Sequence, residues 1–154
     1  MDNYQATLAA PFGMLGIRCE AETLSGIEFL PTGSKPQPPR TSFAQNVCQQ
    51  LAAYFSDPDF RFDLPLQFSS TPHRSKVWQA MRAIPRGQTR YYAELAQQVT
   101  SSPRAVGQAC GANPLPIIIP CHRVVSKAGM GGFMHQRNGK ALDIKRWLLV
   151  HEQR

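Results

Sequence analysis

The sequence lacks any long hydrophobic run. No apolar stretch approaches the roughly 20 residues that a membrane-spanning helix needs. Met1 leads directly into the mixed sequence DNYQATLAAPFG, which does not have the pattern of a secretory signal peptide. The chain has 154 residues, of which 42% are apolar and 18% charged, enough for one substantial core or two small domains. We therefore expect a soluble, cytoplasmic protein with no membrane partner.

The sequence also lacks closely spaced cysteines. Its four cysteines, Cys19, Cys48, Cys110 and Cys121, lie far apart and lack the spacing of metal ligands. This distribution disfavours both a disulfide framework and a structural zinc site. We expect free thiols, no bound metal and no cofactor.

Acidic residues are scarce in the second half of the chain. Residues 71–154 contain three Asp or Glu against thirteen Lys or Arg, a formal charge of +10, whereas residues 1–70 contain seven against four, or −3. A positive field attracts polyanions, and nucleic acid is the commonest polyanion in a cytoplasm. A basic surface that serves only solubility would give the same counts. Charge alone therefore leaves both interpretations open.

The first half of the chain has the pattern of a small α/β domain. Alternating apolar residues predict three strands of an antiparallel sheet, over residues 4–8, 13–19 and 24–30. Residues 31–40 are rich in Pro and Gly and are predicted to be loop. A helical pattern begins at Thr41 and ends at Asp57-Pro58. Residues 62–68 alternate but contain a proline, which predicts an edge strand or a linker. We place the domain boundary between residues 68 and 71.

The second half is predicted to be mainly helical. Four helices are indicated: one starting at Thr71-Pro72, one around Tyr92 to Val99, one from Ser102-Pro103 to Gly111, and one marked by Ile144, Trp147, Leu148 and His151. Lys145 and Arg146 are placed on the flank of the last helix. The second and third helices, joined by a tight turn, resemble a helix-turn-helix. Residues 126–133 hold three glycines and are predicted to be loop.

The third of these helices has little side-chain bulk. Its sequence, SPRAVGQACGAN, carries Arg104 in the first turn and glycines at 107 and 111. Each glycine costs a helix about 1 kcal/mol relative to alanine. Two glycines in one short helix therefore need a reason, either close packing inside the domain or close approach to a binding partner.

The segment PIIIPCHRVV, residues 116–125, contains the most reactive group of the chain. Cys121 follows a run of branched apolar residues, so it is either a buried inert thiol or a nucleophile activated by a neighbouring base. His122 is adjacent, but on a strand the two side chains would point to opposite faces, so a water or a third group would have to connect them. Among the few acids of the second half, Glu152 is the best candidate to orient the imidazole.

The chain resembles the methylated-DNA--protein-cysteine methyltransferases, also called O6-alkylguanine-DNA alkyltransferases. The resemblance rests on PCHRVV, on RAVGQA and NPLPIIIP before it, and on a glycine loop and WLLVHE after it; APFGMLGI, LSGIEFLP, FDLPL, VWQAM, IPRGQT and YAELA follow the family order. It implies a ribonuclease-H-like α/β domain over residues 1–69 and a mainly α winged-helix DNA-binding domain over residues 70–154.

The resemblance also implies a function. A family member binds double-stranded DNA in the minor groove as a monomer, flips out an O6-alkylguanine, and transfers the alkyl group irreversibly to a cysteine thiolate. O4-alkylthymine would be a second substrate. Each molecule would act once. Two alternatives are a non-catalytic relative that only flags alkylated DNA, which the presence of Cys121 opposes, and a thiol hydrolase acting on a metabolite, which leaves the basic charge unexplained.

The family motifs assign roles to individual residues. Cys121 would accept the alkyl group, His122 would act as base through a water, and Glu152 would orient the imidazole. The remaining assignments are Asn113 as the hinge after the recognition helix, Tyr92, Arg104, Ala105 and Gly107 as DNA-binding residues, and Val124, Phe133 and Met134 around the substrate base. Arg104 would fill the space left by the flipped base, and Tyr92 would crowd the phosphate 3′ to it. Backbone carbonyls near Cys121 and Val124 would accept from the guanine amine, and the Met134 amide would donate to O6.

The sequence departs from the family pattern in two places. Phe133 aligns with a tyrosine whose hydroxyl addresses the guanine, so either this hydroxyl is dispensable or a neighbour such as His135 replaces it. The extra length over residues 136–140 makes this the least secure part of the alignment. His73 and Arg74, in STPHR, stand in a segment that commonly reads Gly-Thr-x-Phe-Gln. We interpret this second departure as an altered surface and not a changed mechanism.

Overall fold

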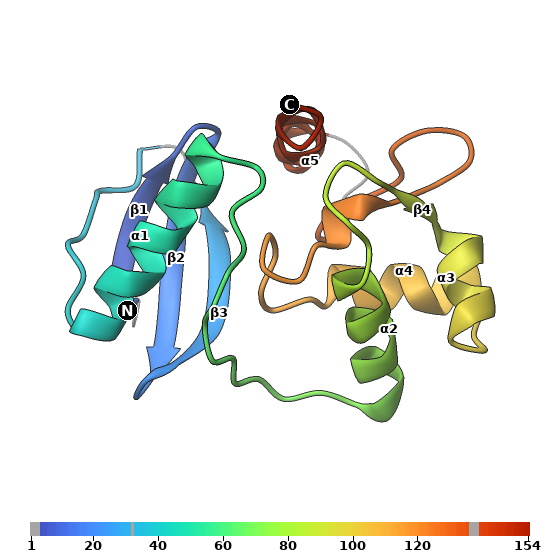
Figure 1. Ribbon diagram of the computed structural model, residues 1–154, viewed down its shortest axis with the longest axis horizontal. Helices are drawn as coiled ribbons and strands as arrows, with labels where there is room; N and C mark the ends of the chain where they lie inside the picture. Colours follow the sequence, from blue (N-terminus) through green and yellow to red (C-terminus); the bar gives the residue numbers. More distant parts are fainter. Residues whose placement is uncertain (1–3, 32, 136–138) are drawn as a thin grey trace. The chain divides into compact units, whose positions relative to one another are not determined.

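The chain divides into two compact units, Met1–Ser69 and Ser70–Arg154. The structure is a computed structural model that describes residues 4–31, 33–135 and 139–154. Figure 1 shows the strands β1 to β3 and helix α1 in the first unit and the remaining elements in the second. Within the described ranges, no helix has both the length and the apolar character needed to cross a membrane.

The first unit is a three-stranded antiparallel sheet with one helix. Its elements are β1 (Ala6–Ala10), β2 (Gly13–Glu20), β3 (Thr23–Leu30) and α1 (Ser42–Ser56). The strand order is β1-β2-β3, with an irregularity between Arg18 and Cys19. The side chain of Thr41 caps α1 by accepting from the Ala44 amide. The helix buries Ala44, Val47, Leu51 and Tyr54. This is the sheet and helix that the sequence pattern predicts, with β1 displaced by two residues.

Residues 62–68 do not form a strand. Leu66 makes an isolated parallel bridge with Leu24 at the start of β3. The Leu24 amide donates to the Pro65 carbonyl at 2.8 Å, and the Gln67 amide donates back to the Leu24 carbonyl at 2.9 Å. Because proline has no amide hydrogen, the segment cannot extend this pairing on both sides. The linker is therefore the correct one of the two expectations.

In the residues of the second unit that the structure describes, four helices pack around a common core. They are α2 (Pro72–Arg82), α3 (Tyr92–Gln98), α4 (Pro103–Gly111) and α5 (Lys140–His151). Thr71 and Ser102 cap α2 and α4, each followed by proline in the first turn. The core is formed by apolar side chains from all four helices and the intervening loop: Val77, Trp78, Met81, Leu95, Val106, Leu115, Ile119, Val124, Ile144 and Leu148. The indole of Trp78 also donates to the Ala109 carbonyl at 2.9 Å, which ties α2 to α4.

A two-residue parallel ladder was not predicted from the sequence. Strand β4 (Arg90–Tyr91) pairs with β5 (Val124–Val125). Two residues are too few to show an alternating pattern, so only the tertiary pairing reveals β4. The ladder joins the start of α3 to the chain immediately after Cys121. Between Cys121 and Arg123 the chain forms one 3-10 turn, η1.

Candidate active site

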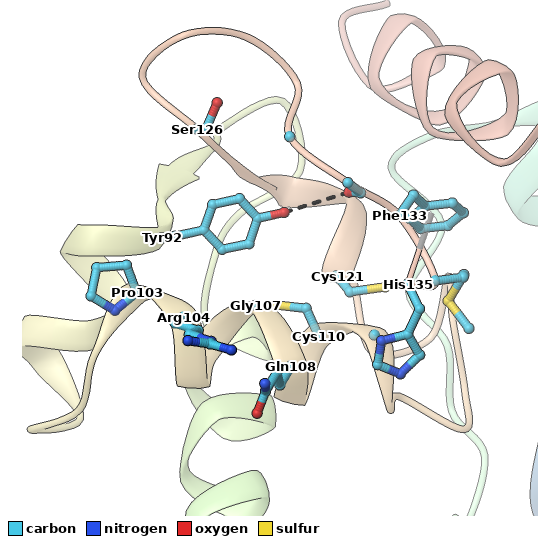
Figure 2. A pocket seen from close by; sticks show the side chains of 14 residues that line it. Tyr92, Pro103, Arg104, Gly107, Gln108, Cys110, Cys121, Ser126, Phe133 and His135 are labelled. Carbon is cyan, nitrogen blue, oxygen red and sulfur yellow. Dashed lines mark hydrogen bonds between the residues drawn. The ribbon is translucent and has the colours of Figure 1, made fainter. Parts of the chain in front are cut away.

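Helix α4 supplies one wall of a cavity of about 860 Å³. Val106 and Ala109 are buried on one side of this helix, whereas Arg104, Gly107 and Gln108 line the cavity on the other. Figure 2 shows these side chains together with Tyr92 from α3 and Cys121. Both explanations for the small residues of α4 therefore apply. One face of the helix packs inside the domain, and the other face borders the cavity.

The segment after α4 carries the thiol to the cavity. The Asn113 side chain donates from Nδ2 to the Ile119 carbonyl at 2.8 Å and accepts the Leu115 amide on Oδ1 at 2.9 Å. Asn113 therefore closes the loop between α4 and η1 from inside. Because its buried amide is satisfied by backbone groups at both ends of the loop, the position of Cys121 is tied to the end of α4.

Cys121 is only 3% exposed, yet it lines the cavity. Burial raises the pKa of its thiol to about 11, while a hydrogen bond from Asn113 and the positive charge of Lys145 act in the opposite direction. The thiol is thus protonated at neutral pH in the protein alone. A reaction that needs the thiolate also needs a base for this proton.

His122, the residue after Cys121, supplies a buried imidazole. Its side chain is fully buried, and Nε2 lies 2.9 Å from Oε2 of Glu152. Burial lowers the pKa of His122, and the Glu152 carboxylate opposes this shift. The imidazole is therefore neutral at neutral pH and able to take a proton. Nδ1 has no hydrogen-bond partner among the described residues. Because η1 turns the chain between Cys121 and His122, the opposite-face geometry of a strand does not apply here.

The cavity contains most of the residues that the sequence suggests for DNA and base contacts. Tyr92, Arg104, Gly107, Phe133 and Met134 all line it. Two of the suggested residues do not line it. Ala105 is half-buried outside the lining. Val124 is fully buried outside the lining, and its carbonyl accepts from Nζ of Lys145 at 2.8 Å.

The cavity residues do not form a metal site. Across the described part of the chain, no three His, Cys, Asp or Glu side chains gather closely enough to hold a metal ion. Cys110 shares the cavity lining with Cys121, but burial raises the pKa of its thiol to about 12 and it donates to the sulfur of Met81. The chemistry of the cavity therefore centres on Cys121.

Comparison with known proteins decides what this arrangement belongs to. Residues 72–154 match the model of the 6-O-methylguanine DNA methyltransferase DNA-binding domain. The methylated-DNA--protein-cysteine methyltransferase of Mycolicibacterium paratuberculosis is 34% identical, covering 96% of this chain and 91% of its own. The constitutive methylated-DNA--protein-cysteine methyltransferase of Bacillus subtilis is 36% identical, covering 98% of this chain and 96% of its own. The chain belongs to the methylated-DNA--protein-cysteine methyltransferase family.

Solved structures agree with this assignment. The crystal structure of Mycobacterium tuberculosis O6-methylguanine methyltransferase has a TM-score of 0.80 and 34% identity, covering 96% of this chain and 90% of that one. A structure of the M. tuberculosis protein in complex with DNA has a TM-score of 0.78 and 35% identity, with 96% and 91% covered. The mixed α/β fold is thus the fold of the methyltransferases.

Arg123 is a site residue that the sequence analysis missed in this methyltransferase. Its Nε and Nη2 donate to the two carboxylate oxygens of Glu152 at 2.9 and 2.8 Å, and its Nη1 donates to the Ile84 carbonyl at 2.6 Å. Burial alone would raise the pKa of Glu152, but the hydrogen bonds from His122 and Arg123 hold it well below its usual range. A guanidinium matches a carboxylate in this two-pronged geometry. The sequence signal was available, since Arg123 follows the Cys-His pair directly.

Lys145 corrects another expectation. The sequence pattern predicts that Lys145 lies on the flank of the last helix, but Lys145 is 0% exposed. Its Nζ donates to three carbonyls, those of Val124 at 2.8 Å, Met130 at 2.5 Å and Gly132 at 2.8 Å. Burial lowers the pKa of Lys145 to about 8. Lys145 stands three positions before Leu148 on the helix, so it falls on the buried face, and only carbonyls from a distant loop make that burial tolerable.

Proposed function

We propose that this protein repairs DNA directly by moving the alkyl group of O6-alkylguanine onto Sγ of Cys121. The proposal rests on one observation above all. Cys121 lines an open cavity, and the next residue, His122, is buried with its Nε2 in contact with the Glu152 carboxylate. This arrangement suits proton removal from the thiol and gives the attacked base a place to enter. Family membership supplies the substrate class.

The reaction needs no cofactor. His122 takes the thiol proton at Nδ1 through one water, and Glu152 stabilises the imidazolium that forms. The thiolate attacks the alkyl carbon, so that a sulfur–carbon bond forms while the carbon–O6 bond breaks and its electron pair passes to the purine. Guanine then regains a proton. Because a thioether is a poor leaving group, the protein is consumed and each molecule acts once.

Two positive groups support the thiolate and its base. The Lys145 ammonium lowers the pKa of Cys121 against the effect of burial. Arg123 fixes both oxygens of Glu152 and thereby holds the imidazole contact. Asn113 acts as the hinge that sets the thiol relative to α4. Together they provide a preorganised site for a charge that appears only when the proton leaves.

DNA binding belongs to the second unit in this proposal. Residues 70–154 form a winged-helix domain, and residues 1–69 form a ribonuclease-H-like domain. Helix α4 enters the minor groove, where Gly107 allows close approach and Arg104 occupies the place of the flipped base. Tyr92 crowds the adjacent phosphate. Phe133 and the Met134 amide contact the base, and backbone carbonyls near Cys121 and Val124 accept from the guanine amine. The protein acts as a cytoplasmic monomer and also accepts O4-alkylthymine.

Mass spectrometry tests the reaction directly. After incubation with methylated duplex DNA, intact protein should gain the mass of one methylene group, on the peptide that holds Cys121, with no more than one equivalent transferred. Cys121→Ser should gain nothing, because a serine hydroxyl is far less acidic than a thiol. Cys48→Ser, a change at a half-buried cysteine in α1, is the matched control and should react like the parent. Uptake by the Cys121→Ser variant, or multiple turnovers, would refute the proposal.

A further inference from the structure

His135 is a polar residue of the cavity wall that the roles above leave unused. Its side chain is exposed and lines the cavity with Phe133 and Met134. The imidazole nitrogens form no hydrogen bond with any described residue. Figure 2 shows His135 drawn on the Cys121 side of the cavity, while Tyr92 and Arg104 are on the other.

The backbone around His135 is held in an uncommon conformation. Met134 has a φ of 51° and His135 a φ of 66°, both in the left-handed region. For residues other than glycine this conformation costs about 1–3 kcal/mol each, and such strain gathers at functional sites. Two consecutive strained residues turn the chain so that the His135 side chain lies on the cavity wall.

A glycine in α4 makes room for this imidazole. A Cβ placed on Gly111 would overlap the ring of His135. Gly111 also lines the cavity. The imidazole can therefore occupy this position only because residue 111 has no side chain. Gly111 and His135 are complementary in shape.

The transfer reaction creates a need for a hydrogen-bond donor in this cavity. When the carbon–O6 bond breaks, its electron pair leaves the purine negatively charged until a proton arrives. Both side-chain hydroxyls that line the cavity are engaged: the Tyr92 hydroxyl donates to the Gly132 carbonyl at 3.5 Å, and the Ser126 hydroxyl donates to the Gly129 carbonyl at 3.3 Å. The ammonium of Lys145 is committed to three carbonyls. Phe133 has no polar side-chain atom.

We propose that His135 donates an imidazole N–H hydrogen bond to the departing guanine and stabilises the charge that develops on it. This assignment rests on the proposed function and adds a substrate-contacting residue to it. Donors aimed at developing charge act mainly on the rate of the chemical step. His135 thus does not serve the affinity of the protein for undamaged DNA.

Three substitutions separate hydrogen bonding from packing. His135→Gln keeps an N–H donor, His135→Phe keeps a flat ring without a donor, and His135→Ala keeps neither. Single-turnover rates at saturation, with free O6-benzylguanine and with methylated duplex, should fall about 10–100-fold for Phe and Ala. The rates for Gln should stay within a few-fold of the parent. Equal losses for Gln and Ala, or full rates for Ala, would overturn the assignment.

A double-mutant cycle with Gly111 tests the geometry. Gly111→Ala displaces the imidazole, so it should slow transfer in the parent and add little in the His135→Ala background. Gly129→Ala, whose added Cβ meets no atom within 4 Å, is the matched control outside the cavity lining. Equal losses in both backgrounds would overturn the inference. If the parent protein itself took up no alkyl group, the proposed function would fail, and this outcome is distinct from a normal rate in His135→Ala.

Discussion

At the scale of single residues, the site depends on charges that are buried and then compensated. His122 is fully buried, Glu152 is 1% exposed, and Arg123 satisfies both oxygens of the carboxylate. Lys145 is buried, and its ammonium donates to three backbone carbonyls. Such groups cost free energy in an apolar interior unless every partner is in place. Their placement therefore ties the stability of the second unit to the chemistry of Cys121.

Stability should fall in acid because of two of these groups. The pKa values of His122 and Glu152 are lower in the folded than in the unfolded chain, so the folded state binds fewer protons. The free energy of unfolding should therefore decrease as pH drops below about 6.5 for His122 and below about 4.5 for Glu152, by up to about 1.4 kcal/mol per pH unit for each proton. Urea unfolding between pH 7 and pH 3.5 measures this slope.

A variant assigns the first part of that slope. His122→Asn should flatten the change between pH 7 and pH 5 while leaving the loss below pH 4.5, which belongs to Glu152. An unchanged slope between pH 7 and pH 5 would show that His122 binds protons equally in the folded and unfolded states, against its lowered pKa in the folded protein.

Arg123→Lys should impair both stability and transfer. Lysine keeps the charge but cannot bind both carboxylate oxygens of Glu152 in parallel. Because a buried carboxylate loses part of its pairing, the free energy of unfolding should fall by about 2–4 kcal/mol. The rate with free O6-benzylguanine should fall as well, since the orientation of His122 loosens. Unchanged kinetics in a variant that is measurably less stable would confine Arg123 to a structural role.

At the scale of elements, the caps and the apolar periodicity predict the helices well. Thr41, Thr71 and Ser102 each accept the backbone amide three residues on, at the helix start expected from the sequence. These signals are local, so they can be read from neighbouring residues. The pairing of β4 with β5 and the bridge from Leu24 to Leu66 depend on residues that are distant in the sequence. A local sequence pattern therefore does not predict them.

Gly107 lowers the stability of helix α4 and leaves the cavity face of the helix without a side chain at this position. A Cβ on Gly107 meets nothing within 4 Å, so Gly107→Ala should raise the free energy of unfolding by up to about 1 kcal/mol. Gly107→Leu should be at least as stable as the parent yet bind undamaged duplex DNA several-fold more weakly, because its side chain fills the face that approaches the groove. Thermal unfolding and fluorescence anisotropy measure the two effects. Parent-like affinity in Gly107→Leu would remove α4 from the DNA interface.

At the scale of the whole molecule, charge separates the two halves. Residues 71–154 carry +10 and residues 1–70 carry −3. A basic half of this kind holds a polyanion mainly through phosphates, which carry no base sequence. In the proposed function, this field brings the protein to DNA, and the cavity beside Cys121 selects the alkylated base.

Affinity for undamaged duplex DNA should fall steeply with salt and depend little on sequence. The logarithm of the association constant should decrease linearly with the logarithm of salt concentration, with a slope of about −0.9 for each phosphate neutralised. Titrations of two unrelated duplexes between about 50 and 200 mM salt measure this slope. A flat dependence would place the basic charge outside the interface.

The sequence by itself determined the helices with their caps, the β-meander, the charge of each half and the identity of the Cys-His pair, because each of these follows from neighbouring residues or from composition. Only the tertiary structure decided that Lys145 is buried and that Arg123 donates to both oxygens of Glu152. The same is true of the cavity, which His135 lines and Val124 does not. The physical reason is that burial and hydrogen bonding depend on which distant backbone groups arrive beside a side chain. The three carbonyls around Nζ of Lys145, those of Val124 in β5 and of Met130 and Gly132 after it, come together only in the folded chain.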